Sequence, residues 1–254
     1  MADNWNQGSR SVPVAGSRVD VTIDQGLRTY MLKVYNLMAL GLAITGVAAY
    51  AMFSLSVVTN GAGDITALTP LGQAVFGSPL KWVLMFAPLG LVMFLSFRVD
   101  KMSVPAAQMT FWAYAGLVGL SLATIFMVYT QESIVQVFFV TAAAFGALSL
   151  FGYTTKRDIS AWGSFLFMGV IGILIASVVN IFLASSALSF AISAIGVLVF
   201  AGLTAYDTQQ IKEMYYEGDG TAVMGRKAIM GALRLYLDFL NMFMFLLQLF
   251  GDRR

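Results

Sequence analysis

Two aspartates stand inside stretches of the chain that are otherwise long and apolar. Asp207 lies in the segment Tyr206-Asp207-Thr208-Gln209, and Asp238 lies in Leu235-Tyr236-Leu237-Asp238-Phe239. A charged side chain is costly in hydrocarbon, and where one occurs it is by default a candidate for an ion or proton pathway. The chain contains no cysteine and no histidine. Thiolate chemistry and histidine metal sites are therefore excluded, and a pH response near neutrality has to come from a carboxylate with a displaced pKa.

Further polar residues share one face of the helix expected around Asp238. Arg234, Asp238, Asn241 and Gln248 fall within about 80° of one another at 100° per residue. We expect this polar stripe to face the bundle interior or water, which makes its helix the central one. The start expected for this helix, Ile229, puts Asp238 roughly 13 Å along it, near mid-membrane.

Asp207 and Asp238 fall on consecutive antiparallel helices, so the two carboxylates could meet. Two adjacent carboxylates cannot both ionise cheaply and therefore share a proton. A plainer alternative stays open. Asp207 could pair with Lys212 near a helix end, and Asp238 could pair with Arg234, four residues earlier.

The composition places these residues in a membrane. Of the 254 residues, 59% are hydrophobic and 11% are charged, with a mean hydropathy of +0.79. Ordinary soluble domains are about 45–50% apolar and about 25% charged, so the excess is too large for a soluble core. A transmembrane helix needs roughly 20 apolar residues.

Seven stretches meet this requirement. The sequence predicts an all-α integral membrane protein, a bundle of seven transmembrane helices with the last one central. Residues 1–28 are expected to form a polar, disordered cytoplasmic tail, and residues 29–254 the membrane domain. The expected spans are Val34–Val58, Leu80–Phe97, Val104–Tyr129, Ile134–Tyr153, Trp162–Ala184, Ala187–Gln210 and Ile229–Phe250.

Positive charges indicate an orientation. Twelve of the 15 Lys and Arg residues fall in the amino-terminal segment and in alternate connections, and only Lys81, Arg253 and Arg254 fall on the other side. Because cytoplasmic loops carry an excess of Lys and Arg, we expect a cytoplasmic amino terminus and an external carboxyl terminus.

Arg98 ends the second expected helix, ten residues after Pro88. It could be an interface anchor whose charged end reaches back to water, or a movable partner for the aspartates. The proline breaks the helix ladder and could supply a hinge for such a movement.

At these residues the sequence resembles the Bax inhibitor-1 family, the transmembrane Bax inhibitor motif proteins. The resemblance is strongest in the last helix, and all seven spans fit it. It is carried by the segments Ala232-Leu233-Arg234-Leu235-Tyr236-Leu237-Asp238-Phe239-Leu240-Asn241, Tyr206-Asp207-Thr208-Gln209-Gln210-Ile211 and Leu148-Ser149-Leu150-Phe151-Gly152-Tyr153-Thr154-Thr155-Lys156.

The resemblance implies a seven-helix bundle with the last helix central and a pH-controlled calcium leak. By motif position Asp207 and Asp238 are its paired aspartates, which would also contact Ca²⁺, and Arg98 is the arginine that latches them. If the chain is a bacterial member of this family, the resemblance implies that it lies in the cytoplasmic (inner) membrane. The chain departs from a calcium-leaking bacterial relative at Ala87, where that relative has an acidic residue. In addition, Arg234 beside Asp238 could repel a cation.

Three functions are compatible with these residues. The first is a pH-gated leak for cations, chiefly Ca²⁺, which prefers six to eight oxygen ligands, so carbonyls, Asn241 or water would have to complete its shell. The second is a non-conducting regulator that binds membrane proteins, such as a membrane-anchored quality-control protease. The third is an intramembrane aspartyl protease, disfavoured because Asp238 lacks a Gly-x-Gly-Asp context. We expect no enzyme activity, no cofactor and no nucleic-acid partner. The expected partners are the lipid bilayer, Ca²⁺ as the transported ion, and other membrane proteins.

Overall fold

The fold is a bundle of long helices. The computed structural model describes residues 16–60 and 64–254, and the side chains of residues 25–60 and 64–254. Within this part of the chain, seven helical spans are long and apolar enough to cross a membrane. The predicted all-α membrane fold is therefore confirmed. The first fifteen residues of the expected tail lie outside the described residues, and from Gly16 onward the chain already belongs to α1.

Six spans are single helices and one is broken. The third span consists of α4 and the short α5, which are separated by two residues. The helices that form the spans are α1 (Gly16–Ser56), α3 (Leu80–Arg98), α4 (Val104–Leu122) with α5 (Ile125–Val128), α6 (Gln131–Thr154), α7 (Trp162–Leu183), α8 (Ser186–Glu213) and α9 (Thr221–Phe250).

The last helix begins earlier than predicted. α9 starts at Thr221, eight residues before Ile229, because two charged residues in its first two turns interrupt the apolar run from which the start was predicted. Asp238 therefore lies roughly 26 Å from the helix start instead of roughly 13 Å. Those first turns carry Arg226 and Lys227, so the apolar segment that follows still surrounds Asp238.

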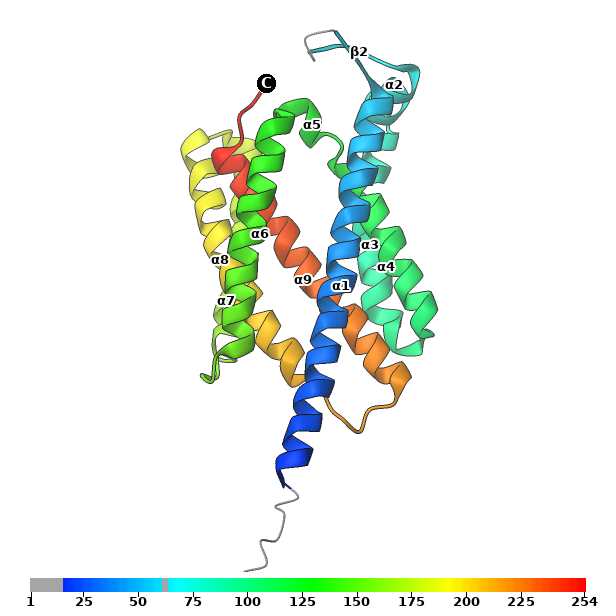
Figure 1. The fold of residues 1–254 in the computed structure, drawn as a ribbon. Helices are drawn as coiled ribbons and strands as arrows, with labels where there is room; N and C mark the ends of the chain where they lie inside the picture. Colours follow the sequence, from blue (N-terminus) through cyan, green and yellow to red (C-terminus); the bar gives the residue numbers. More distant parts are fainter. Residues whose placement is uncertain (1–15, 61–63) are drawn as a thin grey trace, which may run out of the picture.

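The long connection after α1 is folded, which the sequence did not predict. Strands β1 (Val57–Thr59) and β2 (Ile65–Leu68) pair antiparallel, and the short helix α2 (Pro70–Phe76) follows them. Thr69 caps α2 by accepting from the N–H of Gly72, and its own hydroxyl donates to the Leu55 carbonyl oxygen at 2.8 Å. The hairpin therefore lies directly on the end of α1 (Figure 1). A short 3₁₀ turn (Val99–Lys101) joins α3 to α4.

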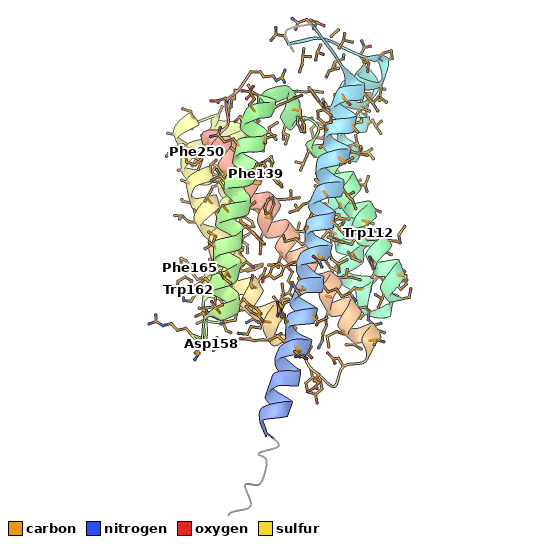
Figure 2. All side chains as sticks on the ribbon, in the orientation of Figure 1. Trp112, Phe139, Asp158, Trp162, Phe165 and Phe250 are labelled. Carbon is orange, nitrogen blue, oxygen red and sulfur yellow. The ribbon has the colours of Figure 1, made fainter. Side chains whose placement is uncertain are left out.

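α9 occupies the centre of the bundle, as predicted. In an apolar 18-residue segment of α9, 61% of the residues are buried inside the protein, whereas the share in the corresponding segments of the other six spans is 33% or less. It packs against α8, α1, α6 and α4 and crosses the bundle between α1 and α6 (Figure 1). α3 and α7 lie at the periphery, with 6% and 11% buried. The side chains of Trp162 and Phe165 point outward from α7, where the lipid would be (Figure 2).

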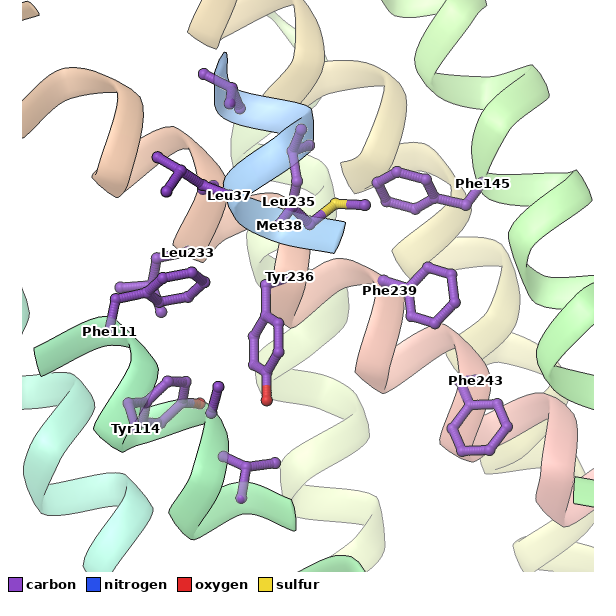
Figure 3. Packing of buried hydrophobic residues seen from close by; sticks show 14 of the residues in the cluster. Leu37, Met38, Phe111, Tyr114, Phe145, Leu233, Leu235, Tyr236, Phe239 and Phe243 are labelled. Atoms are coloured by element: carbon purple, nitrogen blue, oxygen red, sulfur yellow. The ribbon is translucent and has the colours of Figure 1, made fainter. Parts of the chain in front are cut away.

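Tyr236 anchors α9 to the neighbouring helices. Its ring meets those of Phe111 and Tyr114 from α4 edge to face, each at a centroid distance of 5.7 Å (Figure 3). Its hydroxyl lies 2.6 Å from Oγ1 of Thr45, which also donates toward the carbonyl oxygens of Gly41 and Ala115. A buried phenol needs such a partner. These contacts join α1, α4 and α9.

Glycine allows α6 and α8 to approach closely. A Cβ added at Gly152 on α6 would overlap the backbone carbonyl oxygen of Ala205 on α8. Lipid provides no hydrophobic drive between helices, so such small residues permit the close packing that holds them together. Gly146, also on α6, has no atom within 4 Å of its hypothetical Cβ.

These two glycines make a matched test of the α6–α8 contact. Gly152→Ala should destabilise the purified protein by about 1–3 kcal/mol, because backbone atoms cannot move aside. Gly146→Ala should leave stability unchanged or raise it slightly, since alanine favours helix. Thermal unfolding in detergent measures both. Equal loss in the two variants would contradict the packing assignment.

Topology can be tested by thiol labelling, because the native chain has no cysteine. Lys156 is exposed in the α6–α7 connection, and Gln73 is exposed on α2 at the opposite end of the bundle. A membrane-impermeant reagent added outside intact cells should label Gln73→Cys but not Lys156→Cys. Labelling of Lys156→Cys alone would invert the predicted orientation.

Candidate functional site

The two aspartates meet at the contact between α8 and α9. Their carboxyl groups lie close enough to interact electrostatically. Asp238 is 4% exposed, and the side chain of Asp207 is 15% exposed. The antiparallel turn between consecutive helices brings them together, as the sequence analysis expected. Two carboxyl groups can form a hydrogen bond only if one of them carries a proton.

The cation beside this pair is Arg234. Its Nη1 lies 4.0 Å from Oδ1 of Asp207. Arg234 is one helical turn before Asp238, yet its ion pair is with the aspartate on the other helix. Lys212, the alternative partner weighed for Asp207, instead donates to the Tyr153 carbonyl oxygen at 2.8 Å. With a side chain that is 47% exposed, Arg234 joins the buried pair to the bundle surface.

Two buried polar atoms near Arg234 have no hydrogen-bond partner within the described structure: Oδ2 of Asp238 and the hydroxyl of Tyr30. Tyr30 lies on α1 within electrostatic reach of Arg234. Its ring packs on that of Tyr215, in the α8–α9 connection, at a centroid distance of 5.7 Å. Buried polar atoms are almost always satisfied, so orphans in one region indicate a place for water or an ion.

Arg98 is not part of this cluster. It is exposed at the end of α3, and neither of the ion pairs found among the described residues includes it. α3 packs mainly against α4 and contributes little to the buried interior. The latch role of Arg98 stays a prediction, and in this arrangement Arg234 has the contact that the latch would make.

The polar stripe of α9 faces α8 instead of lining one continuous path. Gln248 donates its amide to Oγ of Ser189 on α8 at 2.7 Å, near the opposite end of the helix from Arg234. Asn241 donates to its own helix, at the Leu237 carbonyl oxygen, 2.8 Å away. Gln248 therefore stabilises the α8–α9 contact, Asn241 bonds within α9, and neither bond reaches the aspartate pair.

A chain of hydroxyl groups next to Asp207 was missed by sequence reasoning. The hydroxyl of Tyr35 on α1 lies 2.7 Å from Oγ of Ser149 on α6, which lies 2.9 Å from Oγ1 of Thr208 on α8. Thr208 follows Asp207 along α8 but bonds toward α6, so the hydroxyl chain joins α1, α6 and α8 beside the aspartate pair without contacting it. Both Ser149 and Thr208 stand in segments already singled out by motif, which is the signal that could have found them.

Gln209 fixes the α6–α7 connection against the same part of α8. Its side-chain oxygen accepts from the N–H of Ile159 at 3.0 Å, and its amide donates to the Arg157 carbonyl oxygen at 2.8 Å. One buried side chain thus satisfies two loop backbone groups. The α8 segment around Asp207 is therefore held on both sides.

The cluster is not a complete metal cage. No group of three or more His, Cys, Asp or Glu side chains gathers anywhere in the described ranges 25–60 and 64–254. Asp207 and Asp238 together offer four carboxylate oxygens, fewer than the six to eight that Ca²⁺ takes. A cation at this place would need water or backbone carbonyls as well.

Comparison with known proteins agrees with this architecture. Residues 27–254 match the family model described as inhibitor of apoptosis-promoting Bax1. The inner membrane protein YbhL of Escherichia coli is 46% identical over 233 residues, covering 90% of this chain and 94% of that protein. An uncharacterized protein of Caulobacter vibrioides is 46% identical over 254 residues, covering 99% of both chains.

An uncharacterized protein of Rickettsia prowazekii is 47% identical over 233 residues, covering 92% of this chain and 93% of its own length. Seven membrane-spanning helices and the similarity to an inner membrane protein make this a multi-pass protein of the inner membrane. The family match extends from the start of the first span through the last residue. The chain belongs to the Bax inhibitor-1 family.

Proposed function

We propose that this protein is a pH-sensitive cation leak, chiefly for Ca²⁺, in which the pair Asp207–Asp238 senses protons. The observation that carries the proposal is the buried Oδ2 of Asp238, which has no hydrogen-bond partner within the described structure although a second carboxyl group, that of Asp207, is close enough to interact with it. A purely structural carboxyl in the central helix would have its polar atoms satisfied.

Proton sharing gives the pair two states. With one proton, a hydrogen bond joins the carboxyl groups and the pair carries a single negative charge, which Arg234 faces at 4.0 Å from Asp207. Loss of that proton places two negative charges together in a low-dielectric region, which favours either separation of α8 from α9 or entry of a cation. Gain of a second proton removes the charge that Arg234 faces.

Arg234 limits cation entry in this scheme. Its guanidinium stands on the exposed side of the aspartates, so a cation approaching from that end of the bundle meets a positive charge first. This role is the counterpart of the latch expected for Arg98. The two arginines lie on different helices, α9 and α3, and only one of them contacts the pair.

The aspartate pair should behave as one unit. Asp207→Asn and Asp238→Asn should each flatten the pH dependence of Ca²⁺ flux into proteoliposomes between pH 5 and 8, because neither variant can share a proton between two carboxylates. The double variant should add little, since coupled groups are non-additive. Stopped-flow flux with an entrapped calcium dye measures all three.

Asp158→Asn is the matched control. The hydroxyl and backbone N–H of Ser160 donate to the Asp158 carboxylate and hold its pKa below the usual range, so it stays ionised throughout this interval. Its replacement should leave the pH profile unchanged. A wild-type protein that folds in liposomes but passes no Ca²⁺, Na⁺ or K⁺ at any pH would exclude the leak and leave the non-conducting regulator.

The two arginines can be separated by charge. Arg234→Gln should raise cation flux about fivefold, because a partly exposed ion pair is worth up to about 1 kcal/mol. Arg234→Lys, which keeps the charge, should stay near wild type. If Arg98→Ala raises flux and Arg234→Gln does not, the latch belongs to α3, and the role given to Arg234 is wrong.

A further inference from the structure

A groove runs along the outside of the bundle between α1 and α6. These two helices pack little against each other, and α9 passes behind them (Figure 1). Two cavities lie in this groove, one of about 600 Å³ and one of about 680 Å³. They share Met38, Ala39 and Phe145, and Met38 and Phe145 point toward each other across the groove (Figure 3). The two cavities therefore lie end to end along the groove and adjoin at these residues.

The groove has the dimensions of a bilayer. The first cavity follows α1 from Arg28 to Ala39 and the second from Met38 to Ala49. At 1.5 Å per residue each covers about 17 Å, which is close to half of a hydrocarbon core of about 30 Å. Each cavity is thus about one leaflet deep, and its open side faces the region occupied by lipid chains.

The two halves differ in polarity. The second cavity is apolar apart from Thr45, whose hydroxyl is already bonded to Tyr236 and two carbonyl oxygens. The first ends at the exposed Arg28 and includes Asn36, Ser149 and Tyr153. A second cation lies beside that end, because Nζ of Lys212 is 5.5 Å from the ring centroid of Tyr153.

We propose that the first cavity binds one anionic glycerophospholipid, with its phosphate at Arg28 and Lys212 and one acyl chain along the groove. The occupant follows from the surroundings. A cavity that opens sideways into hydrocarbon is filled by what surrounds it, and two cations at the interface end favour a negative headgroup over a zwitterionic one. Met38 and Phe145, where the two cavities adjoin, stop the chain at the middle of the bilayer.

The cavity shares Tyr35 and Ser149 with the hydroxyl chain that ends at Thr208, but its lining does not include Asp207, Asp238 or Arg234. Tyr35 and Ser149 form its inner wall and satisfy each other at 2.7 Å, so they need no ligand. Gly146 forms part of the α6 wall and has open space where a Cβ would stand. A larger side chain at that position would occupy the volume of the acyl chain without displacing protein atoms.

The test measures retained lipid on the full-length protein in detergent. Native mass spectrometry follows the protein after addition of palmitoyl-oleoyl phosphatidylglycerol or of phosphatidylcholine with the same chains. Wild type should retain one phosphatidylglycerol in preference to phosphatidylcholine. Gly146→Leu should lose that retention, and Ala39→Leu, which narrows the same groove, should lose it as well if the first variant folds poorly.

Two further variants separate the claims. Gly172→Leu on α7 is the matched control, because Gly172 is equally open but lies outside the groove, and it should retain lipid as wild type does. Arg28→Gln should weaken phosphatidylglycerol binding about fivefold and bring it closer to phosphatidylcholine, since a basic residue near the surface is worth about 1 kcal/mol.

Three outcomes would overturn the proposal. The first is that wild type retains no lipid, and the second is that Gly146→Leu retains as much lipid as wild type. The third is that wild type shows a dimer mass that Gly146→Leu abolishes, because the groove would then bind a second copy of the chain. Equal retention of both lipids by wild type would remove the headgroup assignment. Flux does not enter the readout, so failure here and failure of the leak are distinguishable.

Discussion

The contact between α8 and α9 that joins Asp207 to Asp238 imposes the strongest requirement on this fold. A carboxyl group at the centre of a membrane bundle has no water to hydrate it, so the protein has to supply its partners. Those partners come from the facing helix and from Arg234. This explains why the last helix is the most buried one and why its polar side chains face α8 at both ends, through Asp207 and through Ser189.

The remaining helices pack around that contact, some much more closely than others. α6 approaches α8 until only glycine fits at Gly152, and the hydroxyl groups of Ser149 and Thr208 bond across the same interface. α1 is held to α4 and α9 through Thr45 and Tyr236. Between these two well-packed sides, α1 and α6 leave a groove. The bundle is therefore continuous behind the groove and open toward lipid in front of it.

Much of this could be predicted from the sequence because the bilayer limits the choices. Apolar length predicted all seven spans, five of them to within a few residues, whereas α1 and α9 begin well before the predicted residues. The two aspartates on consecutive helices indicated that they could meet. Local polarity was less informative. Arg226 and Lys227 interrupt the apolar run at the start of α9, so its beginning at Thr221 was not predicted. The hairpin after α1 depends on short pairings that leave no periodic pattern.

Side-chain partners were harder to predict than helices. Arg234 is four residues from Asp238 along one helix, which favoured a pair between them, yet the longer reach of its side chain brings it to Asp207 on the neighbouring helix. Lys212 donates a hydrogen bond to the Tyr153 backbone carbonyl oxygen instead of pairing with Asp207. Such choices depend on the rotamers available in the packed bundle, which one sequence does not reveal.

The end of the chain determines how α9 can move. Its last turn is tied to the turn between α5 and α6, where Arg253 pairs with Tyr129 in a β-bridge and the N–H of Asp252 donates to Oγ of Ser133 at 2.9 Å. The other end of α9 follows the connection from Tyr215 to Gly220, where one ion pair, Lys227 with Asp219, joins helix to turn. Lys227 also donates to the Met214 carbonyl oxygen at 2.8 Å, and Tyr236 holds the middle of α9 against α1 and α4. α9 is therefore held at both ends and near its middle, and the segment that carries Arg234 and Asp238 is fixed between these points.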